Sequence, residues 1–207
     1  MHAPLRRRFQ PLPGTQPPLR GLFVDRWGTL LEMPGREPCA RFEDARFVPG
    51  AIDALFRAGQ AGWRTYLIGN EDAVARGRLA DASWEAFERA LLAHLGGRGV
   101  LVARSYACLD HPQGKGAHCR PSVFRLPDTG LLYHAAQVDG VALSQSWVVG
   151  DGSLEAVAAS RAGCHTAGVR TGHALRDGAF QIEPELWADD LAGVVRELLA
   201  CEAYARP

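Results

Sequence analysis

Three polar residues end short apolar runs, and their types and positions could support catalysis. Asp25 ends "GLFVD", Asn70 follows Gly69 at the end of "WRTYLIGN", and Asp151 ends "SWVVGD". Ligands of parallel α/β sheets bind outside the carboxyl ends of the strands, so we expect these residues to meet there. Two carboxylates from different strands can share one Mg²⁺, which prefers oxygen ligands. The alternative is that each acid only caps the turn that follows it.

Apolar runs alternate with amphipathic segments along the chain, which predicts an α/β fold with a Rossmann-like parallel sheet and helices on both faces. The expected strands cover residues 21–25, 63–70, 99–108, 146–151 and 165–172. The expected helices cover residues 49–62, 81–97, 129–140, 153–163 and about 190–203. We expect Ile52, Leu55 and Phe56 to share the buried face of the first helix. Four tryptophans are also expected in the core: Trp63, Trp84, Trp147 and Trp187.

The length of the chain favours one domain over residues 21–207, with an inserted loop at 108–129 that is long for a compact domain. Residues 1–20 are rich in proline and arginine, have no apolar signal-peptide core, and predict an extended arm that could contact a second subunit or a protein partner. The 23 basic residues balance the 23 acidic ones, which argues against nucleic acid or a membrane surface as the partner. Five scattered cysteines favour a reduced, cytoplasmic protein.

Six blocks of the sequence together resemble one superfamily. "FVDRWGTL", "FVPGAIDAL", "LIGNEDAVARGR", "ACLDHPQG", "LPDTGLL" and "VVGDGSLEAVAASRAG" occur in the order typical of the haloacid dehalogenase superfamily. They are most similar to its small phosphatases for heptose bisphosphate and histidinol phosphate. The resemblance implies a haloacid dehalogenase-like fold without a large cap domain, and Mg²⁺-dependent hydrolysis of a small sugar phosphate or similar phosphomonoester. It also implies that Asp25 attacks phosphorus and that Asp25, Asp151 and the carbonyl of Trp27 bind the metal.

Several positions depart from the pattern that this resemblance implies. Trp27 occupies the place of the aspartate that transfers protons, and indole neither gives nor takes a proton at neutral pH. Gly69 replaces a threonine or serine that contacts the phosphoryl group, Leu126 replaces a lysine, and Glu155 stands where a second aspartate is expected. The substrate contacts that remain are Gly69, Asn70 and Arg125, and Arg120 or Lys115 could also supply positive charge. Protons would be handled by Glu71, Asp72 or water.

The inserted loop corresponds to a zinc-binding loop in many of these phosphatases. Cys108, His111, His118 and Cys119 could form a rearranged Cys₂His₂ site, which is a common structural set for Zn²⁺. The alternative is a metal-free loop held by Pro112, Pro121 and Phe124.

Two functions of different classes therefore stay open. The first is a phosphatase-like hydrolase with weak or lost turnover, because proton transfer of the missing kind is worth about 10²–10⁴-fold in rate. The second is a non-catalytic pseudophosphatase that binds a phosphorylated ligand or a protein partner. True dehalogenases also carry an aromatic residue at the place of Trp27, but the remaining blocks resemble the phosphatases, so dehalogenation is the least favoured.

Overall fold

The computed structural model describes residues 18–205 and contains one parallel sheet with the strand order β3-β2-β1-β4-β5-β6. The strands are β1 (Arg20–Asp25), β2 (Trp63–Asn70), β3 (Val102–Cys108), β4 (Trp147–Gly150), β5 (His165–Val169) and β6 (Leu186–Ala188). The helices are α1 (Ala51–Gln60), α2 (Asp72–Ala75), α3 (Asp81–Gly97), α4 (Gly130–Asp139), α5 (Ser153–Ala162) and α6 (Leu191–Ala205). Three short 3-10 helices are η1 (Phe42–Asp44), η2 (Gly116–His118) and η3 (Leu143–Gln145).

The order of the strands creates a switch point beside β1. The chain builds outward from β1 through β2 to β3, and then crosses back to place β4 on the other side of β1. The register pairs Asp25 with Ile68 and Val24 with Val149, so Asp25 is level with the last residues of both neighbouring strands. Asp151 follows immediately after β4. The crevice expected at a switch point therefore opens between the two acids singled out in the sequence.

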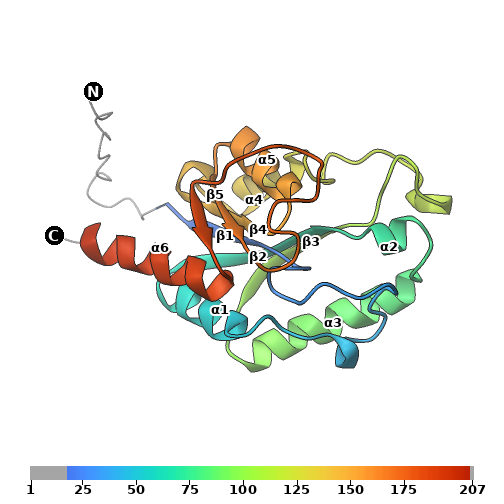
Figure 1. The fold of residues 1–207 in the computed structure, drawn as a ribbon, viewed down its shortest axis with the longest axis horizontal. Coiled ribbons are helices and arrows are strands. Elements are labelled where there is room, and N and C mark those ends of the chain that lie inside the picture. Colours follow the sequence, from blue (N-terminus) through green and yellow to red (C-terminus); the bar gives the residue numbers. More distant parts are fainter. Residues whose placement is uncertain (1–17, 206–207) are drawn as a thin grey trace.

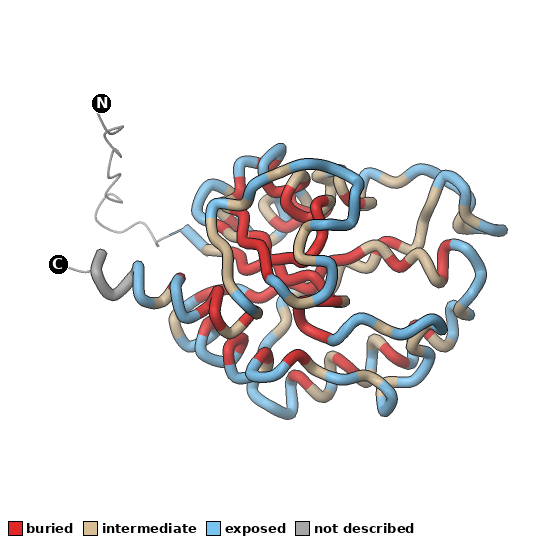
Figure 2. Tube along the Cα trace, in the orientation of Figure 1, coloured by how far each residue is buried: buried red, intermediate tan, exposed pale blue. Residues whose placement is uncertain are grey.

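Helices cover both faces of the sheet, as predicted (Figure 1). The larger core cluster lies between the sheet and α1, α3 and α6, and includes Leu67 and Phe87. The second cluster lies under α4 and α5 and includes Phe23 and Leu131. The central strands are buried along most of their length (Figure 2), which explains their continuous apolar runs, because each face packs against helices. Gly163 ends α5 in the left-handed conformation, the usual conformation of a glycine after a helix.

Some elements differ from the sequence-based expectation. The buried side of α1 consists of Ala51, Ala54, Leu55 and Ala58, whereas Phe56 is 42% exposed. The Phe56 ring lies instead beside Gly99, in the α3–β3 connection. Of the four tryptophans, Trp63 and Trp84 are buried, but Trp147 and Trp187 are only half-buried because they lie near the sheet ends. The short elements α2 and β6 were not predicted, since three or four residues carry too little periodicity.

The inserted loop at 108–129 leaves the end of β3 and contains η2, while residues 1–17 of the predicted arm lie outside the described residues. The extended arm and the division into domains therefore stay predictions. No helix in residues 18–205 is long and apolar enough to cross a membrane.

A matched pair of leucines tests where the core lies. Leu67 is fully buried in β2, whereas Leu101 is 83% exposed in the turn before β3. We expect Leu67→Ala to lower the free energy of unfolding by about 2–5 kcal/mol, because it removes buried methyl groups and leaves a cavity. Leu101→Ala should change it by less than about 0.5 kcal/mol. Urea denaturation measures both, and equal losses would contradict this placement of the core.

Candidate active site

Asp25, Asp151 and Glu155 converge at the switch point. All three side chains are buried, and their charges interact with one another. The backbone closes around the Asp151 carboxyl group so tightly that a Cβ on Gly28 would lie 2.4 Å from it, and one on Gly172 would lie 2.1 Å from it. Only glycine fits at these two positions, which also have positive φ angles. The turn after β1 therefore brings the Asp25 strand directly against Asp151.

The ionisation of these carboxyl groups reflects their crowding. Burial, followed by repulsion from Glu155 and Asp151, raises the pKa of Asp25 well above its usual value, against the opposing charge of Arg26. Burial also raises the pKa of Asp151, although hydrogen bonds from the main-chain N–H and the ring of His173 oppose this shift. Burial raises the pKa of Glu155 to about 7. The protein alone therefore does not neutralise the charge gathered here.

Arg26 does not point its charge at the Asp25 carboxylate. Its guanidinium is fully buried, forms an ion pair with Glu71, and donates to Ser105 Oγ at 2.8 Å and Glu88 Oε1 at 3.3 Å. It also stacks over the Trp84 ring, 4.9 Å from the ring centroid. These contacts hold the residue next to Asp25 in place, because a buried charge has to keep its partners.

Trp27 is fixed by the same network. Its indole Nε1 donates to Glu71 Oε2 at 3.2 Å, and its ring lies 5.4 Å from that of Phe87. Glu71 therefore accepts from Arg26 with one oxygen and from Trp27 with the other. Burial raises the pKa of Glu71, whereas Arg26 and the indole N–H oppose the shift. Of the two carboxylates expected to handle protons, Glu71 is thus committed to positioning the indole, and Asp72 forms an ion pair with Arg125 at 2.7 Å.

The other predicted substrate contacts occupy different places. Asn70 uses its side-chain amide to bind the main chain of Leu126 in both directions, each at 2.9 Å, and so joins β2 to the inserted loop. The Leu126 side chain is buried in the core under α4 and does not line the cavity described below. Gly69 approaches Asp25 Oδ1 and Arg26, where a Cβ would lie 3.2–3.3 Å from both. Arg125 does line the cavity.

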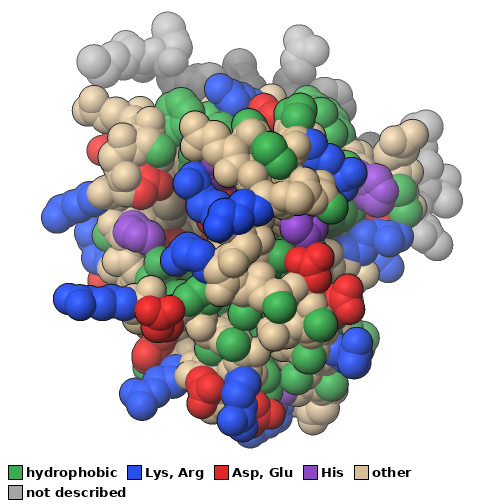
Figure 3. Space-filling view, turned by 90° about the vertical axis from the view of Figure 1, so that its right-hand side faces the viewer, with side chains coloured by type: hydrophobic (Ala, Val, Ile, Leu, Met, Phe, Trp, Pro, Cys, Tyr) green, Lys and Arg blue, Asp and Glu red, His purple; other side chains and the backbone are tan. Residues whose placement is uncertain are grey.

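A cavity of about 370 Å³ opens above these residues. Its floor contains Asp25, Asp151 and Glu155, and two further acids, Glu71 and Asp72, lie at its side. One side, which we call the apolar wall, is formed by Trp27, Met33, Pro34, Pro38, Leu79, Trp84 and Leu154. Figure 3 views the molecule from the side where the strands end, and shows hydrophobic side chains among the charged ones on this face.

The donor set fits a hard divalent cation. Asp25 and Asp151 offer carboxylate oxygens beside the main chain of Trp27 and Gly28, and Mg²⁺ takes such oxygens and keeps several waters. A cation here would offset the repulsion that raises the pKa of Asp25. Since this set uses two side chains and one carbonyl, it agrees with the finding that no group of three or more His, Cys, Asp or Glu in the described part of the chain is arranged as a metal site.

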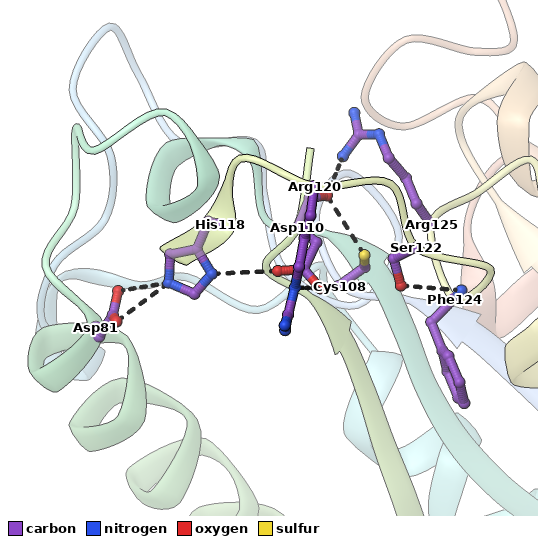
Figure 4. A network of polar contacts seen from close by, with 8 residues as sticks. All are labelled: Asp81, Cys108, Asp110, His118, Arg120, Ser122, Phe124 and Arg125. Carbon is purple, nitrogen blue, oxygen red and sulfur yellow. Dashed lines mark hydrogen bonds and ion pairs between the residues drawn. The ribbon is translucent and has the colours of Figure 1, made fainter. Parts of the chain in front are cut away.

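The zinc site predicted in the inserted loop receives no support. His111 contacts Arg76 and the main chain of Gln113, while Cys108 and Cys119 each face a main-chain oxygen. His118 lies between Asp81 at 3.1 Å and Asp110 at 3.4 Å (Figure 4). The four side chains thus have separate partners, and an ionic contact of His118 with the first residue of α3 ties down the loop.

Comparisons with known proteins agree with this geometry. Residues 123–194 match the model of the HAD-hydrolase-like family. The D-glycero-D-manno-heptose-1,7-bisphosphate 7-phosphatase of Thermosynechococcus vestitus is 31% identical over 187 residues, which cover 86% of this chain and 94% of the relative. The chain belongs to the heptose bisphosphate phosphatase family of the haloacid dehalogenase superfamily. The resemblance inferred from the sequence blocks is therefore confirmed.

Other members of the haloacid dehalogenase superfamily extend the agreement. The Pseudomonas aeruginosa D-glycero-beta-D-manno-heptose-1,7-bisphosphate 7-phosphatase is 34% identical over 156 residues, covering 73% of this chain and 83% of the relative. The crystal structure of a D,D-heptose 1,7-bisphosphate phosphatase from B. bronchiseptica, complexed with magnesium and phosphate, superposes with a TM-score of 0.74. The two are 27% identical, and the match covers 87% of this chain and 98% of the neighbour. The predicted fold class is confirmed.

The sequence did not reveal three contacts of this haloacid dehalogenase site. The Arg26–Glu71 ion pair joins residues 45 positions apart. His173 binds Asp151, and Asp177 accepts from the main-chain N–H and the hydroxyl of Ser153 at the start of α5. The only signal for the last two was their position shortly after β5, where a loop returns to the carboxyl edge.

The two acids that contact Arg26 give a matched stability test. We expect Glu71→Ala to lower the free energy of unfolding by about 3 kcal/mol or more, because it leaves a buried guanidinium without its main partner. Glu88→Ala should cost less, since Glu88 is more exposed and lies farther from the guanidinium. Chemical denaturation compares the two variants, and a larger loss for Glu88→Ala would contradict the assignment of Glu71 as the main partner.

The His118 contact predicts a pH-dependent attachment of the loop. Hydrogen bonds to Asp81, opposed in part by burial and supported by Asp110, raise the pKa of His118 above its ordinary value of 6.5. The stabilisation is therefore complete below about pH 6.5 and is lost as the pH rises through the folded-state pKa. We expect the stability difference between the native protein and His118→Gln to be larger at about pH 5.5 than at about pH 8.5.

The control for this pH test is His94→Gln, because His94 packs on the rings of Phe42 and Phe47 rather than on carboxylates. Its stability difference should not grow on acidification. A difference between native protein and His118→Gln that is the same at both pH values would contradict the ionic contact.

Proposed function

We propose that this protein is a Mg²⁺-dependent phosphohydrolase for a small phosphomonoester, with Asp25 as the nucleophile and with weak turnover. The observation that carries the proposal is the convergence of Asp25 and Asp151 at the switch point, with the main chain of Gly28 closed against Asp151. The names of the relatives support a phosphorylated sugar as the starting point for the substrate class. The neighbour complexed with magnesium and phosphate supports the choice of metal.

The side chains of this protein divide the work of such a reaction unevenly. Asp25 offers an oxygen for attack on phosphorus, and Asp151, Asp25 and the carbonyl of Trp27 would hold the metal. When bound, Mg²⁺ supplies positive charge that keeps Asp25 ionised and balances the phosphoryl oxygens. Arg125 is the cavity cation that follows from the sequence, but its ion pair with Asp72 leaves it weakly available. Positioning is thus retained, whereas charge stabilisation by a lysine at position 126 is absent.

Weak turnover follows from what surrounds position 27. The indole donates to Glu71 and has no exchangeable role in proton transfer, and both Glu71 oxygens already accept hydrogen bonds. Proton transfer to the leaving group and from the attacking water is therefore left to solvent. The loss of general acid–base catalysis alone accounts for about 10²–10⁴-fold in rate.

The second candidate function is a non-catalytic module that binds a phosphorylated ligand or a protein partner. It is favoured by the rigid fixation of Trp27, whose ring packs on Phe87 and whose N–H is bound, at the mouth of the nucleophile turn. It is also favoured by the burial of Leu126 away from the cavity. Against it, two buried carboxylates that repel each other are costly to keep without a metal-dependent role.

Steady-state hydrolysis of a panel of phosphate monoesters with Mg²⁺ separates the two candidates. We expect slow turnover by the native protein, loss of that turnover in Asp25→Asn, and an increase of about 10-fold or more in Trp27→Asp, because the acid regains a proton-transfer group. Asp25→Asn keeps the shape of the side chain and removes only its nucleophilic charge, so it is the matched control.

The opposite outcomes are equally specific. If Asp25→Asn hydrolyses the panel as fast as the native protein, the assignment of Asp25 is wrong. If the native protein is inactive on the whole panel and Trp27→Asp is active, the chain is a pseudophosphatase, and the second candidate function replaces the first.

A further inference from the structure

The apolar wall of the cavity lies opposite the features that a sugar substrate would need. Trp27 and Trp84 both stack against Phe87, with ring centroids 5.4 and 5.7 Å away, so the wall is a rigid aromatic surface. Met33, which is 41% exposed, extends the wall towards solvent. The Trp27 N–H is already bound to Glu71. Sugar hydroxyls would lose water at this wall and gain few hydrogen bonds, whereas a flat apolar group would bury its surface against it.

The charges around the cavity also restrict the leaving group. Six carboxyl groups line it: Asp25, Glu71, Asp72, Asp151, Glu155 and Asp177. The cationic side chains that line it are Arg78, Arg125 and His173, and the last two are paired with Asp72 and Asp151. An anionic leaving group would be repelled by this excess of acids. The portion of the substrate beyond the phosphate is therefore expected to be uncharged.

The missing acid restricts the basicity of the leaving oxygen. An alkoxide leaving group, about as basic as the hydroxide formed from water with its pKa of about 15.7, needs a proton as the bond breaks. A phenolate, whose conjugate acid has a pKa of about 10, is a far better leaving group without one. Since Trp27 gives no proton and Glu71 is occupied by two donors, the site suits a leaving group that departs as the anion.

We propose that the preferred substrate is an aryl phosphate, the monophosphate ester of an uncharged phenol, whose ring packs on the apolar wall. This inference rests on the proposed function, because it requires Asp25 to attack phosphorus. It deepens that function by choosing among phosphomonoesters, and it departs from the sugar phosphates named for the relatives.

The reaction proceeds in two displacements. An Asp25 carboxylate oxygen forms a bond to phosphorus, the bond from phosphorus to the aryl oxygen breaks, and the phenolate leaves with the electron pair and takes a proton from solvent. Water then attacks phosphorus, Asp25 leaves as the carboxylate, and the proton of the water goes to solvent. Because position 27 offers no base for the second displacement, it is slower than the first, and the aspartyl-phosphate accumulates.

The decisive experiment compares three esters in Mg²⁺ buffer: 2-naphthyl phosphate, cyclohexylmethyl phosphate and a hexose 6-phosphate. The cyclohexylmethyl ester is as apolar as the aryl ester but has a basic alcohol as leaving group, so it separates ring packing from leaving-group basicity. We expect kcat/KM for the naphthyl ester to exceed that for the cyclohexylmethyl ester by about 100-fold or more. We also expect a burst of naphthol equal to the concentration of Asp25 sites before the steady state.

Aryl esters are intrinsically more reactive, and Trp27→Asp controls for this. If the preference arises from the missing acid, Trp27→Asp narrows the ratio of the two kcat/KM values by about 10-fold or more and removes the burst. An unchanged ratio in Trp27→Asp would overturn the inference, because the preference would then belong to the esters and not to the site.

The apolar wall is tested separately through KM. Met33→Asn should raise KM for the naphthyl ester by about 10-fold with little change in the burst rate, because it removes apolar contact and leaves Asp25 untouched. Met33→Leu keeps the apolar surface and should leave KM near the native value. Equal KM values in Met33→Asn and the native protein would contradict the placement of the ring.

Failure of the inference and failure of the proposed function give different results. If the hexose phosphate is hydrolysed with a kcat/KM equal to or above that of the naphthyl ester, and Asp25→Asn abolishes this, the aryl preference is wrong and the phosphohydrolase stands. If none of the three esters gives a burst or a Mg²⁺-dependent steady state, both are wrong.

Discussion

Repulsion among buried carboxyl groups is the constraint around which this site is built. Asp25, Asp151 and Glu155 lie in one crevice, and burial together with their mutual charge raises the pKa of Asp25. The fold holds them there through the register of β1 between β2 and β4, and through glycine backbones packed against Asp151. Such an arrangement is unfavourable for the protein alone and becomes favourable when a divalent cation sits among the oxygens. The site thus has the architecture of a metal-dependent centre.

A second network decides what that centre can do. In it the Glu71 carboxylate joins two neighbours of the nucleophile, the buried guanidinium of Arg26 and the indole of Trp27. The positive charge nearest to Asp25 in the sequence is therefore directed away from the cavity, and the side chain at the proton-transfer position is locked as part of its wall. The same contacts that stabilise the turn remove two functions from the reaction, proton donation and neutralisation of the phosphoryl oxygens.

Much of the fold follows from the sequence, because parallel strands buried on both faces and helices ended by glycine leave strong local patterns. The β2 strand was predicted with its observed ends, and Gly163 was predicted to stop α5. The family positions could also be placed residue by residue, and they led to Asp25 and Asp151. The patterns failed where tertiary packing decides, as at Phe56, which lies over Gly99 and not in the core. They also failed for the candidate zinc ligands, since sequence spacing does not tell that His118 turns to Asp81. The Arg26–Glu71 pair had no sequence signal, because two distant charged residues reveal a contact only when the fold brings them together.

The central claim is that Asp25 still attacks phosphorus although the proton-transfer position carries an indole. The most direct measurement is mass spectrometry of the intact protein and its peptides after brief incubation with an aryl phosphate and Mg²⁺ and quenching in acid, which preserves an acyl phosphate. The account predicts one phosphoryl group on the peptide that contains Asp25, and none in Asp25→Asn. An unmodified Asp25 peptide from protein that is releasing phenol, or a phosphoryl group on another residue, would contradict it.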